Sequence, residues 1–369
     1  MLRIHILNVG NGDSIIIEHS DIDNKKSFGV IDSNTQKGHI RALEKLIALG
    51  AEKLSFVCLT HPHDDHYLGL LEILKYFQGR IDRFWTCPLE QYVGAGLKQL
   101  SKVYLDIAKN TDDNKIRNSI RELVGIFKHI DETYQGRWDQ ITGGYNLLAP
   151  SGFSDVEFYA LLPFLDSKGI LTKWLKDGCV TYTNNHNPNH LSVAIMLKYH
   201  GVSLVLGGDA SSANWNKHKR RYQGKNVKIV SQAIKLPHHG SKYDCTDSVM
   251  QYLFGSDEKT YALISADGCT HPDRETLDLL KKRKIKPYCT NFKEVCGNNI
   301  STFNAIPNGI DRDFFARLHE AREENSAITP CHGDITLEIT PNRTNMASIC
   351  VESETKNFCP YHFEDELFS

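Results

Sequence analysis

One stretch of the chain limits its possible folds more than any other, an apolar run that ends in a cluster of histidines and aspartates. The run is Phe56–Leu59, and the cluster that follows it is Thr60-His61-Pro62-His63-Asp64-Asp65-His66. The run is short, partly β-branched or aromatic, and bounded by polar residues, which predicts a buried strand. Pro62 has no N–H group to continue a strand ladder, so the strand should end before it.

The hydrophobic pattern changes after His66. Apolar residues recur near the helical period from Leu68 to Phe77, and Gly79 follows as a stop signal. The histidine cluster is therefore predicted to join the C-terminal end of a strand to a helix. Open α/β sheets place their binding sites at that end of their strands.

The residue types in this cluster indicate metal binding. His61 and His63 are separated by one residue, so in an extended segment both imidazoles point to one side and can hold one ion. Asp65 and His66 lie where the chain turns into the helix and can point at a second ion. Imidazole and carboxylate ligands together suit zinc, manganese or iron better than calcium or magnesium. The alternative is a solvated loop in which Asp64 or Asp65 caps the helix.

The spacing His-x-His-x-Asp-His, formed by residues 61–66, resembles the signature of the metallo-β-lactamase superfamily. Three other segments resemble the hydrolase domain of the competence protein ComEC and its soluble relatives: His5–Ser14, Gly207-Gly208-Asp209 and Leu236–Ser241. The resemblance spans roughly residues 3–340. It implies an α/β fold, an αββα sandwich of two mixed sheets with outer helices, and a dinuclear metal-dependent hydrolase.

The resemblance also implies roles for residues outside the first cluster. Asp209 follows a strand and a glycine turn, and matches the aspartate that bridges both metals in the family. We predict that His238 completes the shell of the second ion and that His239 faces the substrate, although the two roles are interchangeable at this stage. His190 is a candidate ligand of the first ion, with His186 behind it. The predicted metal ligands are therefore His61, His63, Asp65, His66, His190, Asp209 and His238.

Further residues are predicted to support or assist catalysis. Asp65 would orient the nucleophile while it binds metal, and Lys242 or His239 would assist the reaction; a solvated loop lysine is the alternative for Lys242. Asp32 ends a predicted strand and matches a superfamily aspartate that hydrogen-bonds a metal ligand. The alternative for Asp32 is a turn at the end of the strand.

The overall charge of the chain limits which binding partners it can attract. The formal net charge of the 369 residues is −2, so the chain has no overall attraction to polyanions and would need a local basic patch to bind them. Residues 214–228 supply a basic segment interleaved with aromatics, and residues 281–286 supply a second basic run. Each is either a solvated face or part of a nucleic-acid surface.

We expect one domain over residues 1–369, with a helical insertion at about 88–145 and a polar insertion at about 291–330. The helical insertion would shape a substrate cleft or a homodimer contact. Ten scattered cysteines without an N-terminal apolar segment predict reduced thiols in a cytoplasmic protein. No apolar run approaches the length of a membrane span.

The function predicted from these features is hydrolysis of phosphodiester bonds in DNA or RNA. Two divalent ions, zinc or manganese, would activate a bridging hydroxide. One alternative is a small phosphodiester substrate, such as a cyclic nucleotide or a phosphorylcholine ester. Another, from a different class of protein, is a metal-bound interaction module without turnover.

Overall fold

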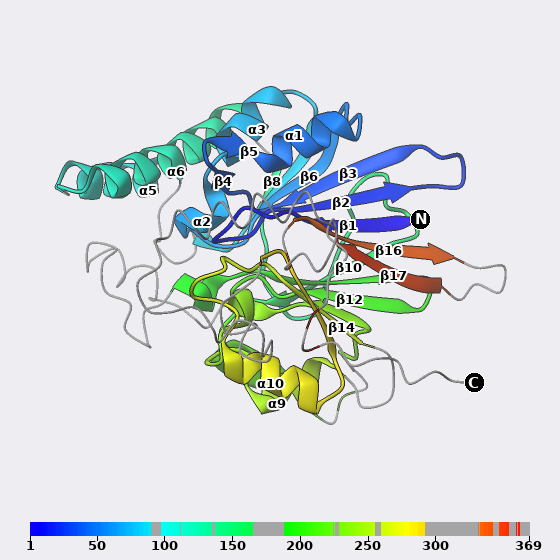
Figure 1. Cartoon of the computed structure of the whole chain (residues 1–369). Coiled ribbons are helices and arrows are strands. Elements are labelled where there is room, and N and C mark those ends of the chain that lie inside the picture. Colours follow the sequence, from blue (N-terminus) through cyan, green and yellow to red (C-terminus); the bar gives the residue numbers. More distant parts are fainter. Residues whose placement is uncertain are drawn as a thin grey trace, which may run out of the picture.

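The computed structural model describes residues 1–89, 97–110, 112–134, 137–164, 188–223, 225, 229–254, 260–291, 331, 333–341, 347–353, 359 and 361. Two large mixed sheets lie face to face, and helices cover their outer sides (Figure 1). This arrangement confirms the predicted αββα sandwich. Most of the predicted polar insertion, residues 292–330, lies outside the described residues.

The first sheet has eight strands in the order β17-β16-β1-β2-β3-β6-β7-β8. Their bounds are β1 (Leu2–Ile6), β2 (Ile15–Ser20), β3 (Lys26–Ile31), β6 (Leu54–Leu59), β7 (Ile81–Thr86), β8 (Trp138–Gln140), β16 (Ile335–Pro341) and β17 (Ala347–Ser353). From β3 to β8 the neighbours are parallel, and the other pairs are antiparallel. The strand β16, near the end of the chain, pairs with β1, which opens it.

The second sheet has seven strands in the order β15-β14-β13-β12-β11-β10-β9. Their bounds are β9 (Asn146–Leu148), β10 (Glu157–Leu162), β11 (Ala194–Tyr199), β12 (Val202–Leu206), β13 (Ala233–Lys235), β14 (Tyr261–Ile264) and β15 (Lys286–Cys289). Neighbours from β12 to β15 are parallel, and those from β9 to β12 are antiparallel. A separate two-stranded ribbon pairs β4 (Thr35–Gln36) with β5 (His39–Ile40).

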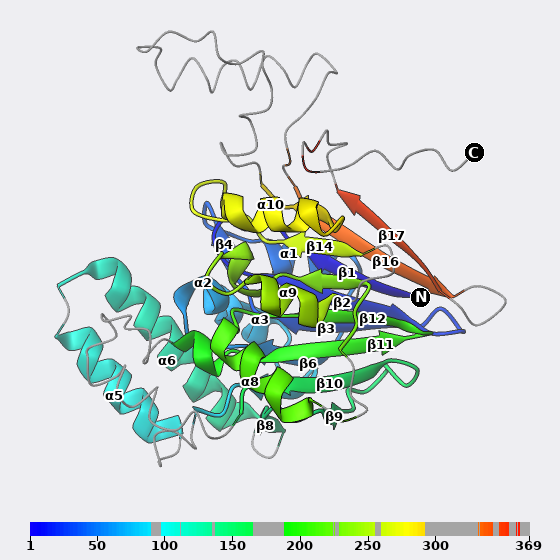
Figure 2. The same cartoon turned by 90° about the horizontal axis from the view of Figure 1, so that it is seen from below.

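Helices form the two outer layers (Figures 1 and 2). On the side of the first sheet lie α1 (Arg41–Ala48), α2 (Asp64–Tyr67), α3 (Leu70–Tyr76), α5 (Leu97–Lys109) and α6 (Asn114–Thr133). On the side of the second sheet lie α8 (Ser212–Tyr222), α9 (Asp247–Leu253) and α10 (Arg274–Lys282). Within the described ranges, every helix is too short or too polar to cross a lipid bilayer.

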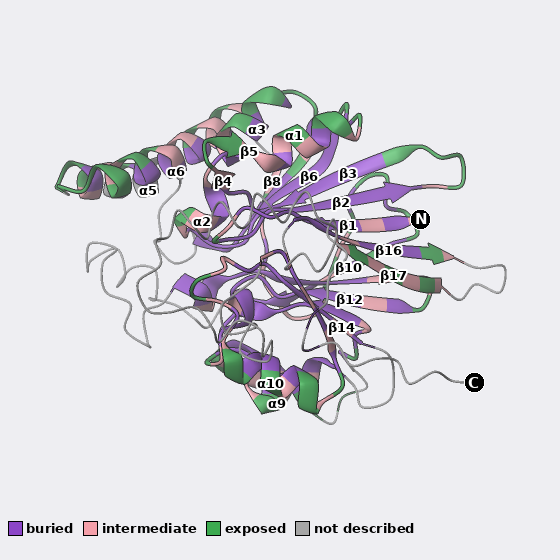
Figure 3. Cartoon of the chain, in the orientation of Figure 1, coloured by how far each residue is buried: buried purple, intermediate pink, exposed green. Residues whose placement is uncertain are grey.

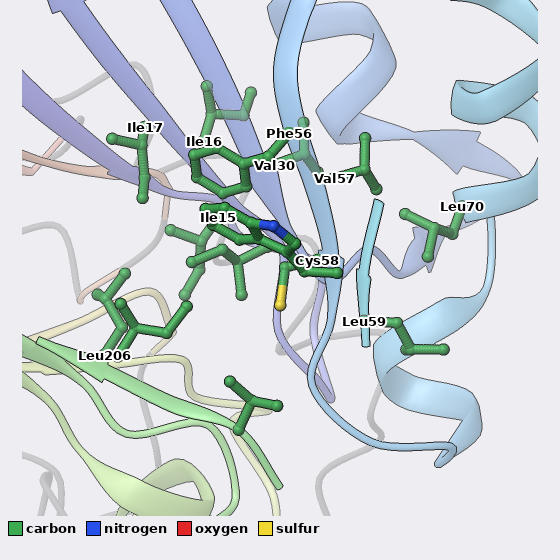
Figure 4. Packing of buried hydrophobic residues seen from close by; sticks show 14 of the residues in the cluster. Ile15, Ile16, Ile17, Val30, Phe56, Val57, Cys58, Leu59, Leu70 and Leu206 are labelled. Carbon is green, nitrogen blue, oxygen red and sulfur yellow. The ribbon is translucent and has the colours of Figure 1, made fainter. Parts of the chain in front are cut away.

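The alternation of apolar and polar residues explains how the sheets pack. In β1, Leu2, Ile4 and Ile6 are fully buried on one face of the strand. Leu206 of β12 reaches from the second sheet toward Ile15 and Cys58 of the first (Figure 4). Burying one such side chain contributes about 1.5–3 kcal/mol. The inner strands are therefore buried through most of their length, whereas the edge strands β8, β9 and β17 have no buried residue and the outer helices expose one side (Figure 3).

The helix predicted after His66 is in fact two helices. The first, α2, begins earlier, at Asp64, and ends at Tyr67. Gly69 then takes a left-handed conformation with φ +82°, so the chain turns before α3 begins at Leu70. The apolar period begins only at Leu68, after α2, so it predicted α3 but gave no sign of the short helix inside the histidine cluster or of the turn after it.

Glu122 of α6 caps this turn and should make stability depend on pH. Its carboxylate accepts a hydrogen bond from the Gly69 N–H at 2.5 Å. Burial raises the pKa of Glu122 to about 7, although this hydrogen bond acts in the opposite direction. The folded pKa lies above the unfolded value, so the contribution to stability is complete below about pH 4 and is lost as the pH rises through about 7. We expect Glu122→Gln to flatten the fall in the free energy of unfolding between these values.

Urea unfolding at several pH values measures this effect. Glu132→Gln is a matched control, because Glu132 is an exposed residue of the same helix. Equal pH profiles for the wild type and Glu122→Gln would contradict the prediction.

Candidate metal centre

The ends of strands from both sheets converge at one edge of the sandwich. From the first sheet, β6 runs into residues 60–66; from the second, β12 leads to Asp209 and β13 leads to residues 237–240. The side chains brought together there are His61, His63, Asp65, His66, Asp209 and His239. Residues nearly 180 positions apart in the chain thus share one site, His61 and His239 among them.

Two carboxylates lie between the histidine rings. Asp209 Oδ2 is 3.3 Å from His66 Nε2 and 3.5 Å from His239 Nε2. The Asp65 carboxylate lies 3.8 Å from His66 Nε2 and 3.7 Å from His239 Nε2. His61 Nε2 and His63 Nδ1 are 2.9 Å apart. Among the described residues, ligand atoms come within 4.8 Å of one another in three overlapping sets: His61/His66/Asp209, Asp65/His66/His239 and Asp13/Asp32/His66.

Buried partners hold these rings from behind. His66 Nδ1 lies 2.7 Å from Asp32 Oδ2, so the predicted hydrogen bond between Asp32 and a candidate ligand is present. His61 Nδ1 lies 3.1 Å from the Thr60 hydroxyl, which itself donates to Asp32 at 2.6 Å. Such partners set the tautomer of a histidine and leave its Nε2 atom for a metal.

The turn between β1 and β2 packs under the ligand loop. The Asp13 N–H donates to the Asp65 carbonyl at 3.2 Å, and Asn11 Nδ2 donates to Asp65 Oδ2 at 3.1 Å. Gly12 has φ +102°, and a Cβ atom on it would collide with the Asp65 carbonyl oxygen. Only glycine allows this close approach, and the turn thereby positions Asp65.

A buried lysine lies beneath the cluster, and the sequence analysis missed it. Lys235, at the end of β13, is completely buried and forms an ion pair with Asp13. Its Nζ atom also lies 3.3 Å from the Gly208 carbonyl and 3.9 Å from Asp209 Oδ1. The one available signal was a lysine in an otherwise apolar strand directly before the Leu-Pro-His-His segment. Its charge compensates two carboxylates that are shielded from water.

Electrostatics divides the histidines into two kinds. Burial lowers the pKa of His61 well below its usual value and that of His63 to about 4, so both rings are neutral, the form that binds metal. His66 differs. Burial would lower its pKa too, but the surrounding carboxylates, Asp209 most of all, hold it well above the usual value. A metal ion must therefore displace a proton from His66.

The donor set fits a bound metal ion. His66 Nε2 and His239 Nε2 are buried and make no hydrogen bond within the described part of the chain, although both face carboxylates. Buried polar atoms without partners are costly, and a cation between ring and carboxylate would satisfy both. Imidazole and carboxylate donors in this ratio suit zinc, manganese or iron.

Three predicted site residues have other partners. His190 Nδ1 lies 2.7 Å from the Ser211 hydroxyl, and His190 is absent from the sets of ligand atoms found among the described residues. Lys242 Nζ bonds Glu275 Oε1 at 2.7 Å on the surface. His238 Nδ1 bonds Asp244 Oδ2 at 2.6 Å. His186, the residue proposed behind His190, lies outside the described residues.

The geometry favours His239 over His238 as a metal ligand. The sequence had left open which of these two histidines binds metal and which faces the substrate. The His239 side chain is 3% exposed and faces Asp65 and Asp209, whereas that of His238 is 28% exposed and faces Asp244. Both residues have left-handed backbone conformations, with φ 47° and 53°. This turn in the backbone sends the two successive rings in different directions, which residue spacing cannot predict.

We therefore expect His239→Ala to weaken metal binding by at least about tenfold, since loss of an outer partner of a ligand alone costs 10–100-fold. His238→Ala should keep its metal, and serves as the matched control. Titration of the chelator-treated proteins with Zn²⁺ or Mn²⁺ in a calorimeter measures both affinities. The reverse ranking of the two variants would restore His238 as the ligand.

A sequence model of the metallo-beta-lactamase superfamily matches residues 7–84. The matched segment includes the turn between β1 and β2, Asp32, and the whole cluster of residues 61–66. No curated protein matches the sequence.

Solved structures resemble the chain at low sequence identity. A mutant of the CmlA beta-hydroxylase is 10% identical, with a TM-score of 0.41; the alignment covers 78% of this chain and 52% of the other, so this chain spans about half of that protein. Igni18, a metallo hydrolase from the archaeon Ignicoccus hospitalis KIN4/I, is 13% identical, with a TM-score of 0.39 and coverages of 78% and 94%. A diphosphatase from the PhnP family is 14% identical, with a TM-score of 0.36 and coverages of 78% and 95%. The matched segment is about a fifth of the chain, and the αββα architecture is consistent with the metallo-beta-lactamase fold.

Proposed function

We propose that this protein is a metal-dependent hydrolase that cleaves phosphodiester bonds in DNA or RNA. The observation that carries the proposal is the convergence of buried, unbonded Nε2 atoms of His66 and His239 on the carboxylates of Asp65 and Asp209. A cation among these atoms would satisfy both rings and offset the charge of both carboxylates.

Two divalent ions, zinc or manganese, would be held by donors of the sets His61/His66/Asp209 and Asp65/His66/His239, together with His63, which belongs to none of the sets. His61 and His63 would hold one ion, and Asp65, His66 and His239 the other. Asp209 lies within reach of both groups, because its Oδ2 atom faces His66 and His239 and its ligand atoms also group with His61. When bound, such ions lower the pKa of water and stabilise charge on phosphoryl oxygens.

The residues of the chain position the reactants. Asp65 is the more open of the two central carboxylates, with 18% of its side chain exposed against 3% for Asp209. Asn11 holds Asp65 Oδ2 at 3.1 Å, so this carboxylate can accept a hydrogen bond from an incoming water in a constant orientation. His238 and His271, with ring centroids 5.4 Å apart, lie beside the buried His239 and offer donors to a leaving group at the rim.

Two further features support a polynucleotide substrate. The three segments at His5–Ser14, Gly207–Asp209 and Leu236–Ser241 resemble the ComEC hydrolase domain. In addition, α8 begins three residues after Asp209 and carries four basic and no acidic side chains between Ser212 and Tyr222. Three of these four lie in the last turn of α8, so they would neutralise phosphates of a polyanion long enough to extend from the metal centre along the helix.

A substrate panel tests the proposal. Protein purified without chelator is analysed for metal and then assayed on single-stranded DNA, duplex DNA, RNA, cyclic nucleotides and bis-p-nitrophenyl phosphate, with His63→Ala as the control. We expect metal-dependent cleavage of polymers that His63→Ala lacks. Cleavage of the small esters alone would overturn the polynucleotide assignment, and silence with metal bound would overturn hydrolysis in favour of an interaction module.

A further inference from the structure

A row of aromatic rings crosses the outer surface of the second sheet beside α8. The rings in order are Tyr159, Tyr145, Tyr222, His218 and Phe164. Neighbouring centroids are 4.5, 6.4, 4.6 and 5.7 Å apart. Two of the residues belong to α8, one to β10, and the others to loops that flank β9 and β10. Segments far apart in the sequence thus build one continuous feature, which we call the aromatic row.

Cationic side chains lie over the rings. Lys198 Nζ is 5.5 Å from the centre of the Tyr145 ring and 5.2 Å from that of Tyr159. Lys225 Nζ lies 5.4 Å from the Tyr222 ring. At the other end, the Arg221 guanidinium is 4.8 Å and Lys217 Nζ is 5.8 Å from Phe164. The row therefore combines apolar faces with positive charge along its whole length.

The two ends of the row differ in exposure. His218 and Phe164 are buried and attach α8 to the sheet, whereas Tyr145, Tyr159 and Tyr222 are only partly buried. The nearby acid Glu157 accepts a hydrogen bond from the Tyr159 hydroxyl at 2.9 Å. Since the whole chain carries a net charge of −2, the concentration of cations here is local rather than general.

The position of the row relative to the metal centre also matters. The N-terminal end of α8 is joined to the 188–191 segment, because Asn214 Nδ2 donates to the His190 carbonyl at 2.7 Å. From there the helix runs for 11 residues to Tyr222, about 16 Å at 1.5 Å per residue. A small phosphodiester held at Asp209 cannot span that distance, but a polynucleotide strand can.

We propose that the aromatic row binds single-stranded nucleic acid, with bases packed against the partly exposed tyrosines and phosphates paired with Lys198 and Lys225. Stacking on aromatic rings tolerates any base, but it needs bases that are not already stacked inside a duplex. The idea that the bound nucleic acid extends toward the metal centre rests on the proposed function. The binding itself does not, because it requires neither metal nor turnover.

Fluorescence anisotropy with a labelled oligothymidylate, in the presence of EDTA, tests this inference. We expect tighter binding of the single strand than of a duplex of equal length. The double variant Tyr145→Ala/Tyr222→Ala should bind the single strand about tenfold more weakly or worse, whereas Tyr145→Phe/Tyr222→Phe should bind like the wild type. Lys198→Ala should reduce the slope of log K against log salt concentration by about 0.7, the loss of one phosphate contact to a single strand.

Matched controls exist elsewhere on the surface. Tyr76 is 47% exposed, and the Arg80 guanidinium lies over its ring at 5.5 Å. Tyr76→Ala and Arg80→Ala should leave binding unchanged. Unchanged binding by the double alanine variant, or equal losses for single strand, duplex and heparin, would overturn the inference. Hydrolysis of bis-p-nitrophenyl phosphate separates the two proposals: its absence with single-strand binding intact would overturn only the proposed function.

Discussion

Asp209→Asn is expected to abolish metal retention and phosphodiester hydrolysis together. The substitution keeps the size of the side chain but removes the charge that faces His66 and His239 at 3.3 and 3.5 Å. Loss of a direct ligand should cost more than the 10–100-fold in metal affinity that loss of an outer partner costs. Metal analysis after dialysis and turnover of bis-p-nitrophenyl phosphate measure the two effects.

Asp139→Asn is a suitable control for this experiment, because Asp139 is half exposed and pairs with Arg83 on the surface.

The affinity of the wild-type protein for metal should also rise with pH. The carboxylates hold the pKa of His66 well above its usual value, so binding must release its proton. Full metal content and activity in Asp209→Asn would remove Asp209 from the site.

Lys235→Met is expected to lower the free energy of unfolding by about 3–5 kcal/mol, the typical cost of removing one partner from a buried ion pair. Methionine has a similar shape but leaves the Asp13 carboxylate buried without its cation. It also removes the positive charge 3.9 Å from Asp209 Oδ1. Urea unfolding in the presence of EDTA separates this effect from metal binding.

Two companion variants make the result specific. Lys53→Met removes an exposed lysine, 3.9 Å from Asp82, and should change stability by less than about 0.5 kcal/mol. Lys235→Met/Asp13→Asn should recover part of the loss, because the uncompensated charge is gone. A change below about 1 kcal/mol for Lys235→Met alone would show that water reaches the pair.

Local sequence patterns were sufficient for the features that depend on neighbouring residues. The apolar run before Thr60 became β6, and the spacing of His61, His63 and His66 placed their rings on one side of a strand end. Asp32 was identified differently, from its match to a superfamily aspartate, and it follows the end of β3 with a left-handed backbone of φ 57°. Strand geometry within a few residues accounts for the directions of His61 and His63.

Other features depend on segments that meet only after folding. The left-handed backbone at residues 238 and 239 turns His239 inward, and the left-handed Gly69 divides α2 from α3. Lys235 was not identified from the sequence, because its partner Asp13 lies 222 residues away along the chain. The aromatic row unites Tyr145 and Tyr222 in the same way.

Some features were predictable from the sequence and others were not because the two kinds depend on residues at different distances along the chain. Periodicity and ligand spacing report which side of a strand or helix a residue occupies, and so they were enough for the strand before Thr60 and for the histidine cluster after it. The two-sheet class was implied by the resemblance to the metallo-β-lactamase superfamily, not by these local patterns. The packing of the two sheets decides which buried charge lies beside which carboxylate. A charged group that is shielded from water costs free energy unless its partner lies next to it. No local pattern carries that information.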